Sequence, residues 1–224
     1  RPSPAHALSP ASVSANTHSA PKSHPSFSAR QYYYPARDAA VGAERLYDLV
    51  TSYLLGAPSR RPSLRYAGAR LSRFLENHDA AAAIRNAAPW AGELAHLEWT
   101  RSEVFDAPDG ATLDRSALSQ PAPQAFGSLH LQLAPWVRRT NYTHPVSELW
   151  RPAVRGKALT TLDLSPRPTH LLIWRKNEEA LHRTLVPLEA EALDQAKAGI
   201  RFDALCVWAA ARASEEEAPS LAAG

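Results

Sequence analysis

The chain has one cysteine, no methionine and no long uninterrupted apolar run. A single cysteine, Cys206, among 224 residues excludes an intrachain disulfide framework and a cysteine-rich zinc site. No stretch approaches the roughly 18 apolar residues that a membrane helix needs, so we expect no membrane partner. No charged-then-apolar signal peptide is visible, and a reducing, cytoplasmic location fits this composition best.

The motifs of the common catalytic and nucleotide-binding classes are also missing. The sequence has no Gly-x-Ser-x-Gly elbow, no phosphate-binding glycine loop, no His-Glu-x-x-His and no dinucleotide fingerprint. Its nine histidines lack paired metal-ligand spacing. Cys206 falls on the apolar face of its predicted helix, where a thiol is typically a small buried side chain. We predict no catalytic residue, no metal, no cofactor and a protein that is not an enzyme.

What the sequence does contain is enough apolar surface for a core, with nearly balanced charge. Hydrophobic residues at 45% and charged residues at 21% are typical of a soluble globular chain. The 25 basic residues against 22 acidic ones give a net charge of +3, which does not by itself indicate nucleic acid. The placement of the charges is therefore more informative than their sum.

Composition divides the chain into five segments. Residues 1–29, rich in Pro, Ser, Ala and His without a hydrophobic period, are predicted to be a disordered arm, and residues 214–224 an acidic disordered tail. Pro, Ser and Gly interrupt every period over 116–127, which predicts a linker there. This linker would separate a helical domain at 30–115 from an α+β domain at 128–213.

Helical periodicity dominates the first domain. Apolar residues recur on one face over 46–54, and Gly56 then supplies a stop. Ser63 can cap a second helix that continues to Leu75, and a third begins at Pro89 and runs through 105. The pattern predicts a helical bundle.

The second domain mixes the two periods and gives the chain its α+β class. We predict a strand at 129–133, a short helix at 146–150, a β-hairpin of 170–174 and 181–186 with its turn at 176–179, and two helices at 188–198 and 202–209. Gly199 is expected to end the first of these helices, so the last two resemble a helix-turn-helix pair. We also expect the indole rings of Trp99 and Trp174 to lie in the core.

Two groups of residues are candidate binding surfaces. The first is a basic run free of acidic residues that can contact phosphates or a protein partner, or can be a solvated surface: Arg60, Arg61, Arg65, Tyr66, Arg70 and Arg73. The second lies on the predicted hairpin, which can bind an extended peptide, belong to a winged DNA-binding module, or simply complete the core: His170, Leu172, Trp174, Arg175 and Arg183.

Five segments of the sequence form a recognisable series: Val41–Tyr47, Pro62–Gly68 leading to Phe74 and Leu75, Leu94–Trp99, Tyr142–Trp150 and Leu171–Arg175. Together they resemble a bacterial family that is named for a DNA-binding domain and includes the partner proteins of methanobactin and bufferin maturation. The likeness extends over roughly residues 30 to 210. This chain is shorter than the family pattern between the aromatic run at 32–34 and Val41.

The resemblance implies a two-domain protein, helical first and α+β second. It implies a partner that does no chemistry itself, but binds a multinuclear non-haem iron oxidase and helps to present a small ribosomal precursor peptide, with the second domain as peptide platform. The family name implies instead a transcriptional regulator that binds DNA through its first domain.

Overall fold

The computed structural model describes residues 43–110, 127–155 and 162–212. These residues form seven α-helices and one antiparallel sheet of order β1-β2-β3, so the chain mixes helix and sheet as the α+β prediction requires. The predicted arm at 1–29 and tail at 214–224 lie outside the described residues, as does the predicted linker apart from Gly127. No helix within the described ranges has the length and apolar character needed to cross a membrane.

Within the described residues, six helical elements precede the sheet. They are α3 (Ala43–Gly56), η1 (Leu64–Gly68), α4 (Leu71–Asn77), η2 (Asp79–Ala81), α5 (Ala82–Ala87) and α6 (Ala91–Asp106). The predicted helices at 46–54 and 89–105 are confirmed by α3 and α6. The helix predicted from Ser63 to Leu75 is divided into η1 and α4. Ser63 does cap η1, because its hydroxyl accepts a hydrogen bond from the backbone N–H of Arg65.

The hairpin prediction is confirmed by β2 (Thr169–Lys176) and β3 (Glu179–Leu185). The two residues between the strands, Asn177 and Glu178, have φ angles of 49° and 61°. Two consecutive positive φ values are the geometry of the tight hairpin turn that matches strand twist. The polar turn therefore sets the register, in which Ile173 faces His182 across the pair.

The strand predicted at 129–133 is wrong. In that segment only His130 forms a bridge, to Arg201, and the strand that pairs with β2 on the side opposite β3 is β1 (Val137–Tyr142). The leucines of 129–133 alternate but lie half-buried in an extended segment. The sequence of β1 is mostly polar. It forms a strand because it pairs with the free edge of β2, and polar side chains are tolerated in an edge strand.

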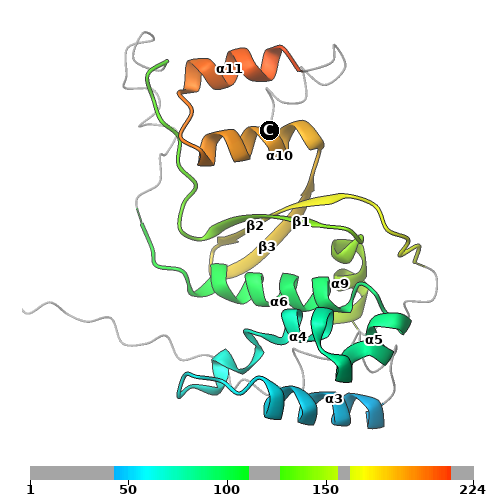
Figure 1. Ribbon diagram of the computed structural model, residues 1–224. Helices are drawn as coiled ribbons and strands as arrows, with labels where there is room; N and C mark the ends of the chain where they lie inside the picture. The colour runs from blue at the N-terminus through cyan, green and yellow to red at the C-terminus, as the bar shows by residue number, and fades with distance from the viewer. Residues whose placement is uncertain (1–42, 111–126, 156–161, 213–224) are drawn as a thin grey trace, which may run out of the picture.

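The elements stack in layers around the sheet. In Figure 1, α6 lies below the sheet, with α4, α5 and α3 beyond it, while α10 (Pro187–Lys197) lies above the sheet with α11 (Phe202–Ala210) beyond. The short helix predicted at 146–150 is α9 (Val146–Val154), beside α6. The predicted terminal helices are α10 and α11, and Gly199 follows α10 with φ of +86°, as a helix stop requires.

One buried core joins the helices to the sheet. Leu94, Leu97 and Val104 of α6 belong to the same cluster of buried side chains as Leu171 and Ile173 of β2. All five side chains are nearly or fully inaccessible to solvent. Helix α6 is therefore the central element. The face of α6 that points away from these buried residues contributes to the site described below.

Three expected core residues are less buried than predicted. Trp99 and Trp174 are only half-buried, and Cys206 is exposed. Cys206 is exposed because α11 has no buried residue at all: its apolar side chains are distributed around the helix, and they pack only partly on neighbouring segments. Trp174 points to the opposite face of β2 from Ile173, since side chains alternate along a strand.

Candidate binding cleft

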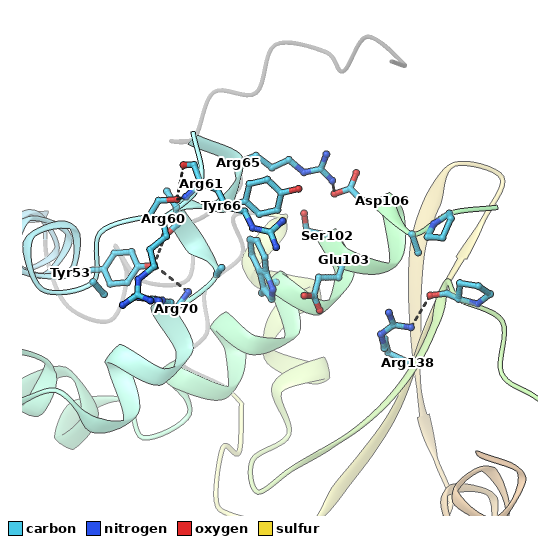
Figure 2. A pocket seen from close by; sticks show the side chains of 18 residues that line it. Tyr53, Arg60, Arg61, Arg65, Tyr66, Arg70, Ser102, Glu103, Asp106 and Arg138 are labelled. Atoms are coloured by element: carbon cyan, nitrogen blue, oxygen red, sulfur yellow. Dashed lines mark hydrogen bonds and ion pairs between the residues drawn. The ribbon is translucent and has the colours of Figure 1, made fainter. Parts of the chain in front are cut away.

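A cleft of about 700 Å³ opens between the η1 region and α6 (Figure 2). We call it the arginine cleft, because arginines predominate among the charged side chains that line it: Arg60, Arg61, Arg65, Arg70, Arg138, Glu103 and Asp106. The sequence prediction named five of the lining residues, Tyr66 included. The sixth predicted residue, Arg73, is an exposed residue of α4 that does not line the cleft.

Local structure holds the arginine-bearing segment in place. The buried Tyr53 of α3 donates its hydroxyl hydrogen to the carbonyl of Ala67 and accepts a hydrogen bond from the backbone N–H of Arg70 at 3.3 Å. Its ring meets Phe74 edge to face, with centroids 5.3 Å apart. The loop before η1 is closed by Ser59, whose hydroxyl accepts from the backbone N–H of Arg61 at 3.2 Å. Four arginines are thus presented by a segment anchored to α3.

Aromatic rings form part of the lining. The rings of Tyr66 and Trp99 lie with centroids 6.5 Å apart, one from η1 and one from α6. The guanidinium of Arg61 lies 4.5 Å from the centroid of the Tyr66 ring, and that of Arg65 lies 5.9 Å from it. Both are cation–π distances. The cleft therefore offers flat apolar surface beside positive charge.

The charges are not spread evenly over the cleft. Figure 2 shows four arginines on the η1 side and the carboxylates of Glu103 and Asp106 on α6. Arg65 forms an ion pair with Asp106 that spans the two sides. Arg138 of β1 donates to the carbonyls of Pro135 and Val137 at 2.7 and 2.9 Å.

Two arginines of the cleft keep their guanidinium groups available. Within the described ranges, neither Arg60 nor Arg70 has a side-chain ion pair, and both residues are exposed. An unpaired guanidinium presents a rigid fork of N–H donors that matches a carboxylate or a phosphate. In chemical terms the arginine cleft is equipped to bind an anionic group beside an aromatic surface.

The predicted hairpin residues are distributed over both faces of the sheet. His170, Leu172 and Trp174 are half-buried and lie on the opposite face from Leu171 and Ile173. The register places them beside β1 residues of the same face, and His170 Nδ1 lies 2.6 Å from Oδ1 of Asn141. The structure therefore brings these three residues together on one surface.

The two predicted hairpin arginines are each held by partners within the chain. Arg175 donates to the carbonyls of Phe105 and Ala107 at 2.6 and 2.8 Å, at the C-terminal end of α6, and pairs with Asp109 at 2.5 Å. Arg183 forms a two-pronged ion pair with Glu189 of α10, at 2.8 and 2.9 Å. This pairing lowers the pKa of Glu189 and raises that of Arg183. Both guanidiniums thus have structural partners.

Sequence reasoning missed a polar cluster between α6 and the sheet. The buried His182 of β3 accepts from Arg101 of α6, with Nδ1 and Nη1 2.7 Å apart. Burial, together with the nearby positive charges of Arg101 and Arg151, lowers the pKa of His182 to about 4. Arg101 also lies 3.9 Å from the centroid of the Trp150 ring. No motif links these positions, because only the fold brings them together.

A second missed contact joins the start of α6 to the segment after β1. The carboxylate of Glu93 accepts from the backbone N–H groups of Thr143 and His144, at 2.8 and 2.9 Å. Nearby, burial raises the pKa of Tyr142 to about 12. In the described part of the chain no group of three or more His, Cys, Asp or Glu side chains is arranged to hold a metal ion.

Comparison with known proteins adds no named relative to these observations. No family model matches the chain, and no match to a curated protein was found. The family resemblance therefore stays a prediction that rests on the quoted segments, among them Leu94–Trp99 in α6 and Leu171–Arg175 in β2.

Proposed function

We propose that this chain is a non-catalytic binding protein that associates with a multinuclear non-haem iron oxidase and its ribosomal precursor peptide during peptide maturation. The observation that supports it is the arginine cleft, which joins available guanidiniums, aromatic rings and carboxylates in one open cavity. Mixed charge beside aromatic surface is typical of protein recognition, where complementary charges select the partner. The identity of the partners comes from the family resemblance.

The proposal includes a division of labour between two domains. The helical first domain would supply most of the arginine cleft, to which the second domain adds Pro135 and Arg138. The second domain would hold the peptide at its sheet, with the helix-turn-helix-like pair of α10 and α11 behind it. In the described ranges, neither β1 nor β3 pairs with a further strand along its outer edge. An extended peptide binds such an edge by adding a strand.

An affinity pull-down of the tagged chain from its native lysate, with and without nuclease, tests this function. We expect an iron-containing oxidase to be retained after nuclease treatment, together with its small peptide substrate. Mass spectrometry and iron analysis of the eluate identify both. Recovery of nucleic acid without an oxidase would reject the maturation role.

A second candidate function is that of a DNA-binding regulator, and the available guanidiniums of Arg60 and Arg70 favour it. Fluorescence anisotropy with labelled DNA at increasing salt tests this candidate. Binding through several phosphate contacts would weaken steeply, because each contact releases a counterion. Affinity that is independent of salt, or no binding, would exclude it.

A further inference from the structure

We infer that the arginine cleft is the binding site for an acidic segment of a polypeptide, and that the aromatic pair Tyr66 and Trp99 packs against that segment. The inference rests on the proposed function and assigns the ligand class of the cleft. Its chemistry would recognise carboxylate side chains displayed on an extended stretch of chain.

The available donors point to a carboxylate ligand. Arg60 and Arg70 come from either end of the segment that contains η1 and line the same cavity. Arg61 is placed over the Tyr66 ring, so its charge lies beside the aromatic surface. Guanidiniums bind carboxylates through paired hydrogen bonds, and neighbouring aromatic rings pack against the aliphatic or aromatic parts of the same peptide.

The carboxylates of α6 favour a peptide over nucleic acid. Glu103 and Asp106 line the cleft opposite the arginines, and among the described residues only Asp106 has an ion-pair partner there, Arg65. Duplex DNA carries one negative charge for about every 1.7 Å of its axis, and it cannot rearrange those charges to avoid Glu103. A polypeptide can place its acidic side chains on the arginines and direct backbone N–H groups toward Glu103.

The dimensions of the cleft fit the same ligand. Its volume of about 700 Å³ lies within the range of roughly 300 to 1,000 Å³ that is typical of ligand pockets. Such a volume accepts a short stretch of extended chain. The long side chains of Arg60 and Arg70 are exposed, so they can adjust to the spacing of carboxylates.

Fluorescence anisotropy with a short fluorescein-labelled peptide of glutamate, glycine and one tyrosine tests the inference on the full chain. We expect the double variant Arg60→Ala, Arg70→Ala to weaken binding about tenfold or more, because charge-assisted hydrogen bonds are lost. Arg73→Ala is the matched control, since this arginine is exposed on α4 outside the cleft, and it should stay within about twofold. Thermal melting of each variant confirms that it folds.

Three results would overturn the inference. They are equal loss in the control and the double variant, no binding of the acidic peptide by the wild type, and tighter binding of a labelled DNA duplex that the double variant abolishes. Co-elution with the iron oxidase, measured on the same proteins, separates this inference from the proposed function. If the double variant binds the oxidase normally but loses the acidic peptide, the inference holds, and the acidic segment that enters the cleft is not the one through which the oxidase is bound. If the wild type binds the acidic peptide but never the oxidase, the proposed function fails alone.

Discussion

Nη1 of Arg101 lies 2.7 Å from Nδ1 of His182, which links the central helix to the last strand of the sheet. Because a guanidinium can only donate, Nδ1 must be the acceptor, and the imidazole is neutral in this arrangement. Protonation of His182 would remove the acceptor and place a third positive charge beside Arg101 and Arg151. The pair therefore makes part of the stability of the fold depend on pH.

The first prediction is the sign of that dependence. His182 takes up a proton near pH 6.5 in the unfolded chain but only near pH 4 in the folded one. Between these values the unfolded state binds more protons, so the contribution is intact above pH 6.5 and is lost as the pH falls toward 4. Thermal unfolding across this range should show a smaller decline for His182→Asn, which keeps an acceptor but does not titrate. Parallel curves for the two proteins would contradict it.

The second prediction concerns Arg175. Its guanidinium donates to two carbonyls at the end of α6 and pairs with Asp109. We expect Arg175→Ala to lower the free energy of unfolding by about 2 to 3 kcal/mol, because partly buried carbonyls lose charged donors. Arg183→Ala should cost less than about 1 kcal/mol, since its ion pair with Glu189 is surface-exposed. Urea unfolding compares the two variants, and equal losses would refute the capping role of Arg175.

The third prediction uses the two tyrosines of α3. Tyr53→Phe removes the hydroxyl that joins the backbones of Ala67 and Arg70. It should lower the free energy of unfolding by about 1 kcal/mol and weaken binding at the arginine cleft, because the arginine segment loses its anchor. Tyr47→Phe is the control on the same helix, since Tyr47 is 74% exposed. A binding loss shared by both variants would contradict the anchoring role.

The fourth prediction distinguishes the role of Trp99 in binding from the role of Leu97 in core packing. Leu97→Ala should cost about 2 to 5 kcal/mol of stability, because Leu97 is fully buried. Trp99→Ala should cost less than the 3 to 5 kcal/mol that is usual for a core tryptophan, since Trp99 is half-buried, but it should weaken acidic-peptide binding. Unimpaired binding by Trp99→Ala would remove the ring from the site.

Local patterns were enough to predict α3, α6, α9, α10, α11 and the hairpin. Helix α3 has an apolar period that can be read directly from the sequence, and the polar turn at 176–179 predicts β2 and β3 because it separates two apolar runs. The strand β1 was missed because its pairing depends on a partner distant in sequence. Non-local pairing of this kind leaves little trace in a polar edge strand.

Only the arginine side of the candidate site was predicted from the sequence. The run of arginines from Arg60 to Arg70 was visible in the sequence, because it lacks acidic residues. The opposing carboxylates of Glu103 and Asp106 were not among the predicted site residues, because only the packing of η1 beside α6 brings them to the cleft. The exposure of Cys206 also could not be predicted, since an apolar helical pattern does not say whether a partner covers it.

Hydrogen–deuterium exchange tests the central claim most directly, with the chain measured alone and in complex with the iron oxidase and its peptide. Backbone amides that become covered exchange more slowly. The account predicts new protection over residues 59–70 and 99–106, the two segments that face each other across the arginine cleft. Protection confined to α10 and α11, with exchange at these two segments unchanged, would contradict it.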